Sequence, residues 1–178
     1  NSGTSALICA FLSLGLKKND EVVMTGYTHI ATPNTAKLLG LNIRVVDIEK
    51  ENSFADFNLI KKSLNKKIKC LVLAAINGRV SDSIFNICKL AKSKKIPIII
   101  DGASALGSYK NNKQILSLGD ITTTSFSTSK LISSGQGGAI FTNSKSIYDK
   151  IKPLKNFGRL KSTDERFSIY GLNFKMSD

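Results

Sequence analysis

The sequence is poor in the residues that build metal centres and disulfide frameworks. It has one histidine, three cysteines and no tryptophan among 178 residues, and it contains no CxxC motif. A Cys/His metal site is therefore excluded. Cys9, Cys70 and Cys88 are odd in number, widely spaced and set in apolar stretches, which indicates reduced core thiols and is typical of a cytoplasmic protein.

Long apolar runs are also missing. The longest, Ile96–Ile100, includes a proline and is too short to cross a bilayer. The first sixteen residues lack the basic segment, apolar stretch and cleavage site of a signal peptide. We therefore expect neither a membrane span nor a secretory leader.

Acidic residues are scarce, since 13 Asp and Glu face 26 Lys and Arg and give a net charge of +13. Such a balance raises the possibility of a nucleic-acid-binding protein. Only four of the 26 basic residues are arginine, however, and the lysines are dispersed. No helix-turn-helix, zinc-finger or RNP-type motif accompanies the charge, so we expect a solvated lysine-rich surface and no nucleic-acid or membrane partner.

Short apolar runs alternate with segments of helical spacing. The predicted strands are 21–24, 43–48, 68–75, 97–101, 121–126 and 138–142, and the predicted helices begin at 2–5 and span 28–39, 56–64, 82–94 and 144–157. Asp82 or Ser83 is the expected cap of the fourth helix. The alternation predicts an α/β fold with a mostly parallel sheet and helices on both faces. Ligands bind at the carboxyl ends of such strands, which directs attention to the residues after 24, 75, 100 and 125.

Two segments carry groups that could hold a phosphate or a flat ring. Small residues open the first helix at Ser2–Ser5, where free backbone amides favour an anion, although an ordinary helix cap explains them equally well. Tyr27 and His29 follow the strand 21–24 and could stack on a heterocycle, or lie in a solvated loop.

Two others carry an acid and an amine. Asp101 ends an apolar strand, where a buried carboxylate needs a partner such as a protonated ring nitrogen; the alternative is a cap on the next segment. Lys130 follows a serine-rich turn after another strand and could form an imine, while a surface lysine is the alternative. Glycines at 135–138 allow the backbone to approach a ligand. A phosphate site, a stacking ring, an acid and an amine are together what pyridoxal 5′-phosphate (PLP) requires.

The sequence resembles the DegT/StrS family of sugar aminotransferases, which are fold-type-I PLP enzymes. The resemblance rests on motifs that occur in the family's order and spacing over nearly the whole chain. They are NSGTSAL at 1–7, GYTHIATPNTA at 26–36, VVDIE at 45–49, INGR at 76–79, IIIDGASALGSYKNNK at 98–113, SLGDITTTSFSTSK at 117–130, SSGQGGAIFTN at 133–143, LKNFGR at 154–159 and GLNFKMSD at 171–178.

The resemblance implies a role for each candidate residue. Lys130 would be the catalytic residue, joined to the cofactor as an imine and then acting as acid and base in the proton shift. Asp101 would pair with the pyridinium nitrogen. The remaining cofactor contacts implied are Thr4, Ser5 and Ser125 on the phosphate, His29 on the ring face, Ser104 near the 3-hydroxyl, and Asn173 from the segment that members lend to the neighbouring subunit. Ser104 stands where the family usually has Gln or His, which implies a weaker or water-mediated contact.

The resemblance also implies that the chain is part of a larger enzyme. Residues 1–158 would form an incomplete PLP-binding large domain that lacks its first strand. Residues 159–178 would begin the connection toward a C-terminal small domain that is missing here. The family's active site lies at the interface of a homodimer.

The activity implied is transfer of an amino group, from glutamate as the expected donor, through PLP and its pyridoxamine form (PMP), onto a nucleotide-linked keto-deoxysugar in surface-polysaccharide or lipopolysaccharide biosynthesis. A PLP/PMP-dependent sugar dehydratase is an alternative, but the related 3-dehydratases often replace the lysine with histidine, so Lys130 favours transamination. A catalytically inactive homologue is a further alternative. INGR and NFGR resemble the branch of perosamine-type C4 synthases.

Overall fold

The computed structural model describes residues 1–161, 163 and 165–176. The strands are β1 (Glu21–Thr25), β2 (Asn42–Val46), β3 (Ile68–Ala74), β4 (Ile98–Asp101), β5 (Tyr109–Lys110), β6 (Lys113–Gln114), β7 (Ile121–Ser125) and β8 (Gly138–Phe141). The helices are α1 (Gly3–Ser13), α2 (Ala31–Leu38), α3 (Phe57–Ser63), α4 (Ile84–Ser93) and α5 (Lys145–Leu154), with short 3₁₀ turns η1 (Ile76–Gly78) and η2 (Ile115–Ser117).

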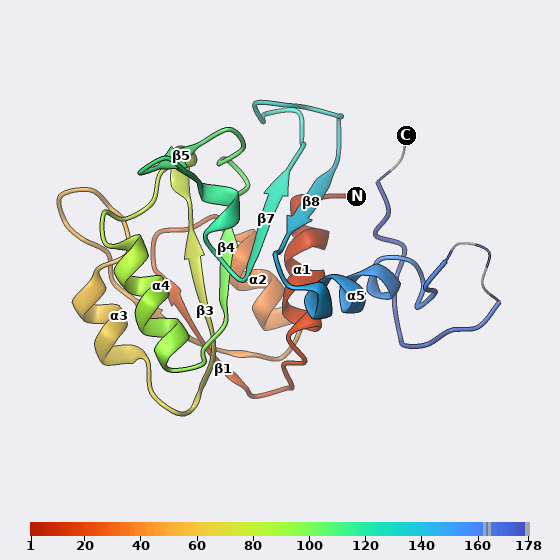
Figure 1. Cartoon of the computed structure of the whole chain (residues 1–178), viewed down its shortest axis with the longest axis horizontal. Coiled ribbons are helices and arrows are strands. Elements are labelled where there is room, and N and C mark those ends of the chain that lie inside the picture. Colours follow the sequence, from red (N-terminus) through yellow and green to blue (C-terminus); the bar gives the residue numbers. More distant parts are fainter. Residues whose placement is uncertain (162, 164, 177–178) are drawn as a thin grey trace.

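The main sheet is mostly parallel, as the sequence predicts. Its order is β2-β1-β3-β4-β7-β8, and only β8 runs antiparallel to its neighbour (Figure 1). The parallel strands β1 to β4 are joined by connections that contain α2, α3 and α4, and β4 is joined to β7 through β5, β6 and η2, whereas a loop over 126–137 links β7 to β8. A chain that returns without a crossover pairs in the opposite direction, which explains the reversed strand.

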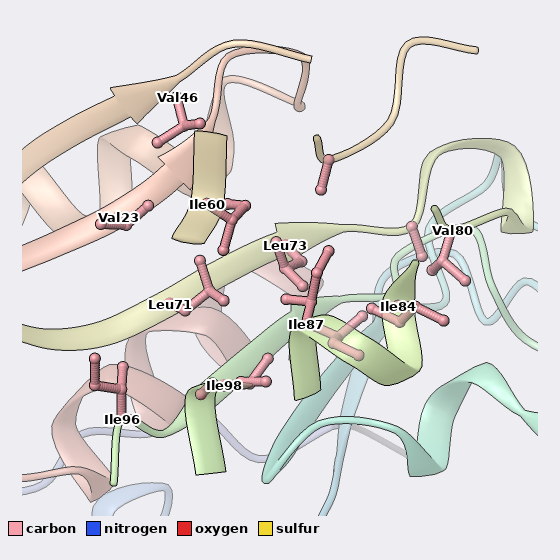
Figure 2. Packing of buried hydrophobic residues seen from close by; sticks show 14 of the residues in the cluster. Val23, Val46, Ile60, Leu71, Leu73, Val80, Ile84, Ile87, Ile96 and Ile98 are labelled. Carbon is pink, nitrogen blue, oxygen red and sulfur yellow. The ribbon is translucent and has the colours of Figure 1, made fainter. Parts of the chain in front are cut away.

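Helices cover both faces of this sheet. Alternate residues of the central strands point to opposite faces and pack into two separate cores. Leu71 and Ile98 belong to the core under α3 and α4, which contribute Ile60 and Ile87 (Figure 2). The neighbouring positions on the same strands join the second core, under α1 and α2, where Phe11 is fully buried. Strands that are apolar on both faces are typical of a parallel sheet at the centre of a fold.

Helix ends agree less closely with the sequence prediction. The Asp56 side chain caps α3 by accepting a hydrogen bond from the Leu59 amide at 2.8 Å. For α4 the expected cap is wrong: Ser83 occupies the position but its side chain makes no capping hydrogen bond, and Asp82 pairs instead with Lys110. The helix predicted over 144–157 ends at Leu154, since the chain turns away to form further backbone contacts.

The last segment of the chain lies against the first. Asn156 forms an isolated antiparallel bridge with Asn173, and the amino group of Asn1 donates to the Phe174 carbonyl at 2.7 Å. Residues 162, 164, 177 and 178 of the segment 159–178 lie outside the described residues. No helix in the described part of the chain has the length and apolar character that a membrane crossing requires.

Candidate cofactor site

A pocket of about 460 Å³ lies where four of the parallel strands end. Residues at or just after the ends of β1, β3, β4 and β7 line it, together with the first turn of α1. The lining residues are Ser2, Gly3, Thr4, Leu7, Tyr27, Thr28, His29, Ala31, Ala74, Ala75, Ile76, Asn77, Asp101, Ala103, Ser104, Ser125, Ser127, Ser129, Lys130 and Gln136. The pocket therefore lies at the sheet edge that the strand pattern indicated.

Asp101 is the acidic group of this pocket and is only 6% exposed. It is the last residue of β4, and its two carboxylate oxygens are held separately. Oδ2 accepts a 2.5 Å hydrogen bond from the Thr32 hydroxyl, and Oδ1 accepts one of 3.1 Å from the Ala103 amide. Neither donor carries a charge, so the carboxylate remains able to bind a cation from the pocket side.

Lys130 supplies the amine. A backbone turn that begins at Ser127 carries it, since the Lys130 amide donates to the Ser127 carbonyl at 3.0 Å. Its side-chain Nζ donates to the Ser104 hydroxyl at 3.2 Å, so the two predicted residues are in direct contact. An amine held by one hydroxyl keeps further hydrogen-bonding capacity for a ligand.

The first turn of α1 forms a cradle against the end of β7. The Gly3 and Thr4 amides have no intrahelical acceptor at this position, and the helix dipole favours an anion there. The approach is close, because a Cβ on Gly3 would lie 2.9 Å from the Ser125 Cβ. Thr4 and Ser125 therefore face one pocket from two elements.

His29 and Tyr27 are exposed residues that line the pocket. The Nδ1 atom of His29 accepts a hydrogen bond from the Ala31 amide at 3.2 Å, at the start of α2. This bond fixes the ring relative to the helix and leaves Nε2 to carry the proton when the imidazole is neutral.

Two predicted residues do not line the pocket. Ser5 is buried behind it, where its hydroxyl donates to the Asn1 side chain at 2.5 Å and contacts the Ser2 hydroxyl at 2.9 Å. Asn173 is exposed on the C-terminal segment, and its carbonyl accepts from the Asn1 side chain at 3.0 Å. The other six (Thr4, His29, Asp101, Ser104, Ser125 and Lys130) lie together.

The sequence prediction missed Thr32, Asn77 and Gln136. Thr32 lies in the first turn of α2, four residues after Thr28 in the preceding loop, and its role shows only in its contact with Asp101. Asn77 follows β3, one of the strand ends singled out by the pattern, and has a positive φ of 51°. A non-glycine residue in this conformation next to a pocket is a signal that the sequence alone does not give.

These residues fit PLP. A carboxylate with uncharged donors suits a protonated pyridine nitrogen, a helix start beside Ser125 suits a phosphate, and Lys130 suits an aldehyde. The volume falls within the range of cofactor sites. No group of three or more His, Cys, Asp or Glu side chains in the described ranges is placed to hold a metal ion.

Relatives of known activity match the chain over its whole length. It is 33% identical to the GDP-perosamine synthase of Escherichia coli O157:H7, covering all of this chain and 49% of that protein. It is 34% identical to the dTDP-4-amino-4,6-dideoxy-D-glucose transaminase of Shigella dysenteriae, covering 100% of this chain and 47% of that protein. The chain thus spans about half the length of these curated relatives.

Solved structures share the fold. The aminotransferase from Psychrobacter cryohalolentis superposes with a TM-score of 0.91 at 26% identity, covering 99% of this chain and 47% of that one. NtdA from Bacillus subtilis, solved with bound PMP, gives a TM-score of 0.89 at 29% identity, covering 98% of this chain and 40% of that one. The predicted fold class and cofactor class are thereby confirmed for the family. The sequence profile of the DegT/DnrJ/EryC1/StrS aminotransferases matches residues 1–178, and the chain belongs to this family.

Proposed function

We propose that the protein containing this chain is a PLP-dependent aminotransferase that acts on nucleotide-linked keto-deoxysugars. The observation that carries the proposal is the meeting of Lys130 and Asp101 in one pocket beside the start of α1. The names of the relatives, which are sugar-nucleotide transaminases and GDP-perosamine synthases, support the substrate class.

The residues divide the work as follows. Asp101 would hold positive charge on the ring nitrogen, and the α1 amides with Thr4 and Ser125 would hold the phosphate. His29 would lie against the ring face. When bound, the cofactor supplies an electron sink that makes a proton at the adjacent carbon removable.

Lys130 is the group that attaches the cofactor and moves the proton. Its Nζ lies 3.2 Å from the Ser104 hydroxyl, which orients the amine toward the pocket. With the cofactor bound, the Lys130 amine would be placed to take a proton as a general base and to return it as a general acid. Ser104 holds this amine and would lie near the ring's 3-hydroxyl, as the family resemblance implies.

Several finer assignments belong to the same proposal. Glutamate is the amino donor, and the product enters surface-polysaccharide or lipopolysaccharide synthesis. The enzyme is a cytoplasmic homodimer, in which Asn173 acts in the partner's site and Ser5 supports the phosphate cradle from behind. Free cysteines support a reducing compartment. Three GDP-perosamine synthases among the relatives support amination at C4.

The decisive experiment is reduction of the full-length holoenzyme with borohydride, followed by peptide mapping. We expect the pyridoxyl group on Lys130. Lys130→Ala should bind PLP only reversibly, and Lys113→Ala, which changes a lysine outside the pocket, should be labelled like the wild type. A pyridoxyl group on another lysine would refute the assignment.

A second measurement tests the reaction class. Addition of glutamate to the holoenzyme should convert its absorption to that of PMP, and a nucleotide-linked 4-keto-sugar should restore the original spectrum. A spectrum that no amino donor changes would favour a dehydratase or an inactive homologue.

A further inference from the structure

The carboxylate of Asp101 is reached by a chain of two hydroxyls from α2 and the loop before it. The Thr28 hydroxyl donates to the Thr32 hydroxyl at 3.2 Å, and the Thr32 hydroxyl donates to Asp101 Oδ2 at 2.5 Å. Thr32 is 2% exposed and Asp101 is 6% exposed. This is therefore a buried, directional contact between a helix and the end of a strand.

The donors on Asp101 are few. Besides Thr32, the described residues offer it one hydrogen bond, from the Ala103 amide, and no salt bridge. A buried carboxylate holds its negative charge only as far as donors and cations compensate it. Removal of the Thr32 hydroxyl would leave one protein donor on a carboxylate that water barely reaches.

The position of Thr32 is itself fixed. Its carbonyl accepts a 2.8 Å hydrogen bond from the Thr35 hydroxyl, and Thr32, Thr35 and Ala36 form the buried face of α2. The helix packs on α1 and the sheet. The Thr32 hydroxyl is therefore already held beside the carboxylate, and little side-chain entropy is lost when the hydrogen bond forms.

We propose that Thr32 is a positioning residue that holds the Asp101 carboxylate in place at the pocket, so that the carboxylate pairs with a protonated ring nitrogen of the bound cofactor. The inference rests on the proposed PLP site. The shared proton has two possible places, the ring nitrogen or the carboxylate. Each donor on the carboxylate favours the arrangement with the proton on nitrogen, because it stabilises the anion.

The chain offers a matched control. Thr122 is completely buried in β7, and its hydroxyl has no hydrogen-bond partner among the described residues. Thr32→Val and Thr122→Val therefore make the same chemical change at two buried sites, but only the first removes a donor from Asp101. Thr32→Ser keeps the hydroxyl and tests rescue. Thr32→Ala removes the hydroxyl without placing a second methyl group against the sheet.

The experiment uses full-length enzyme loaded with PLP labelled with ¹⁵N in the ring. The wild type, Thr32→Ser and Thr122→Val should show a protonated ring nitrogen by NMR. Thr32→Val and Thr32→Ala should shift this signal toward the neutral form and weaken PLP binding by about tenfold, as expected for loss of one hydrogen bond to a charged group. Apoenzyme melting of the two valine variants separates this effect from a general loss of stability.

The outcomes are distinguishable. If the hydroxyl-free variants at position 32 give the wild-type nitrogen signal and PLP affinity, the role of Thr32 is refuted while the cofactor site stands. The same holds if Thr122→Val weakens PLP binding as much as they do. If the wild type itself binds no PLP, the proposed function fails, and the role of Thr32 fails with it.

Discussion

Replacement of Gly138 by alanine should disturb the cofactor site from a distance. Gly138 begins β8 and pairs with Ser125 at the end of β7. A Cβ at this glycine would lie 2.4 Å from the Ser2 carbonyl oxygen, 2.5 Å from its carbon and 2.8 Å from the Gly3 nitrogen. All three neighbours are backbone atoms at the start of α1, so no side chain can rotate away to make room.

The size of the effect follows from this crowding. Overpacking a well-filled site costs about 1–3 kcal/mol. For a domain of this size, about 2 kcal/mol corresponds to a fall of roughly 4–8 °C in melting temperature. The helix start must also move away from β8, so the phosphate cradle should loosen and PLP affinity should fall along with stability.

The assay compares Gly138→Ala with Gly26→Ala in the full-length protein. A Cβ on Gly26 would meet Val45 at 3.4 Å, an ordinary contact, so this variant should melt within about 1 °C of the wild type, as surface substitutions commonly do. Melting and PLP titration are measured on both. If Gly138→Ala keeps both the melting temperature and the PLP affinity of the wild type, the packing of α1 against β8 described above is wrong.

Two further predictions concern a helix cap and the thiols. Asp56→Ala should cost about 1 kcal/mol of unfolding free energy, because the Leu59 amide loses its acceptor, whereas Asp56→Asn should retain most of it; equal losses in denaturant titrations would contradict a capping role. Burial raises the pKa of the Cys9 and Cys88 thiols to about 11 and also raises the pKa of Cys70. Mass mapping after brief alkylation at pH 8 should therefore find the three thiols largely unmodified in the native protein and modified after unfolding. Unfolded thiols titrate near 9.0, so between pH 9 and about 11 the folded state holds more protons and stability should fall as the pH rises. A native protein as reactive as the unfolded one, or stability that rises over this range, would refute the burial argument.

The sequence was sufficient for the fold class and for the place of the pocket. Runs such as Ile98–Ile100 can be stable only when both faces of a strand are covered, and this requirement identifies a central parallel sheet. The carboxyl ends of the strands in this sheet place Asp101, Ser125 and Lys130 in one pocket with Thr4, although Thr4 is distant from these three residues in the sequence. The combination of these groups already pointed to PLP, and the resemblance to a family added the substrate class.

Contacts decided by tertiary packing could not be predicted. Asp82 looks like a helix cap in the sequence but pairs with Lys110, a residue on β5. Asn111 and Asn112 both have positive φ and form the turn that connects β5 to β6. Asn residues favour such turns, but the two flanking strands are too short to be predicted from the sequence pattern. Ser5 is placed by the motif at the phosphate, yet the helix turns its hydroxyl toward Asn1.

The dispersal of the pocket along the chain has a consequence for the order of events during synthesis. Its walls run from Ser2 in the first helix to Gln136 in the loop before β8. A ribosome-bound chain therefore cannot present the complete site until this loop has emerged and β7 has joined the sheet. Cofactor loading then follows the folding of this part of the chain, and it stabilises the assembled sheet through mass action.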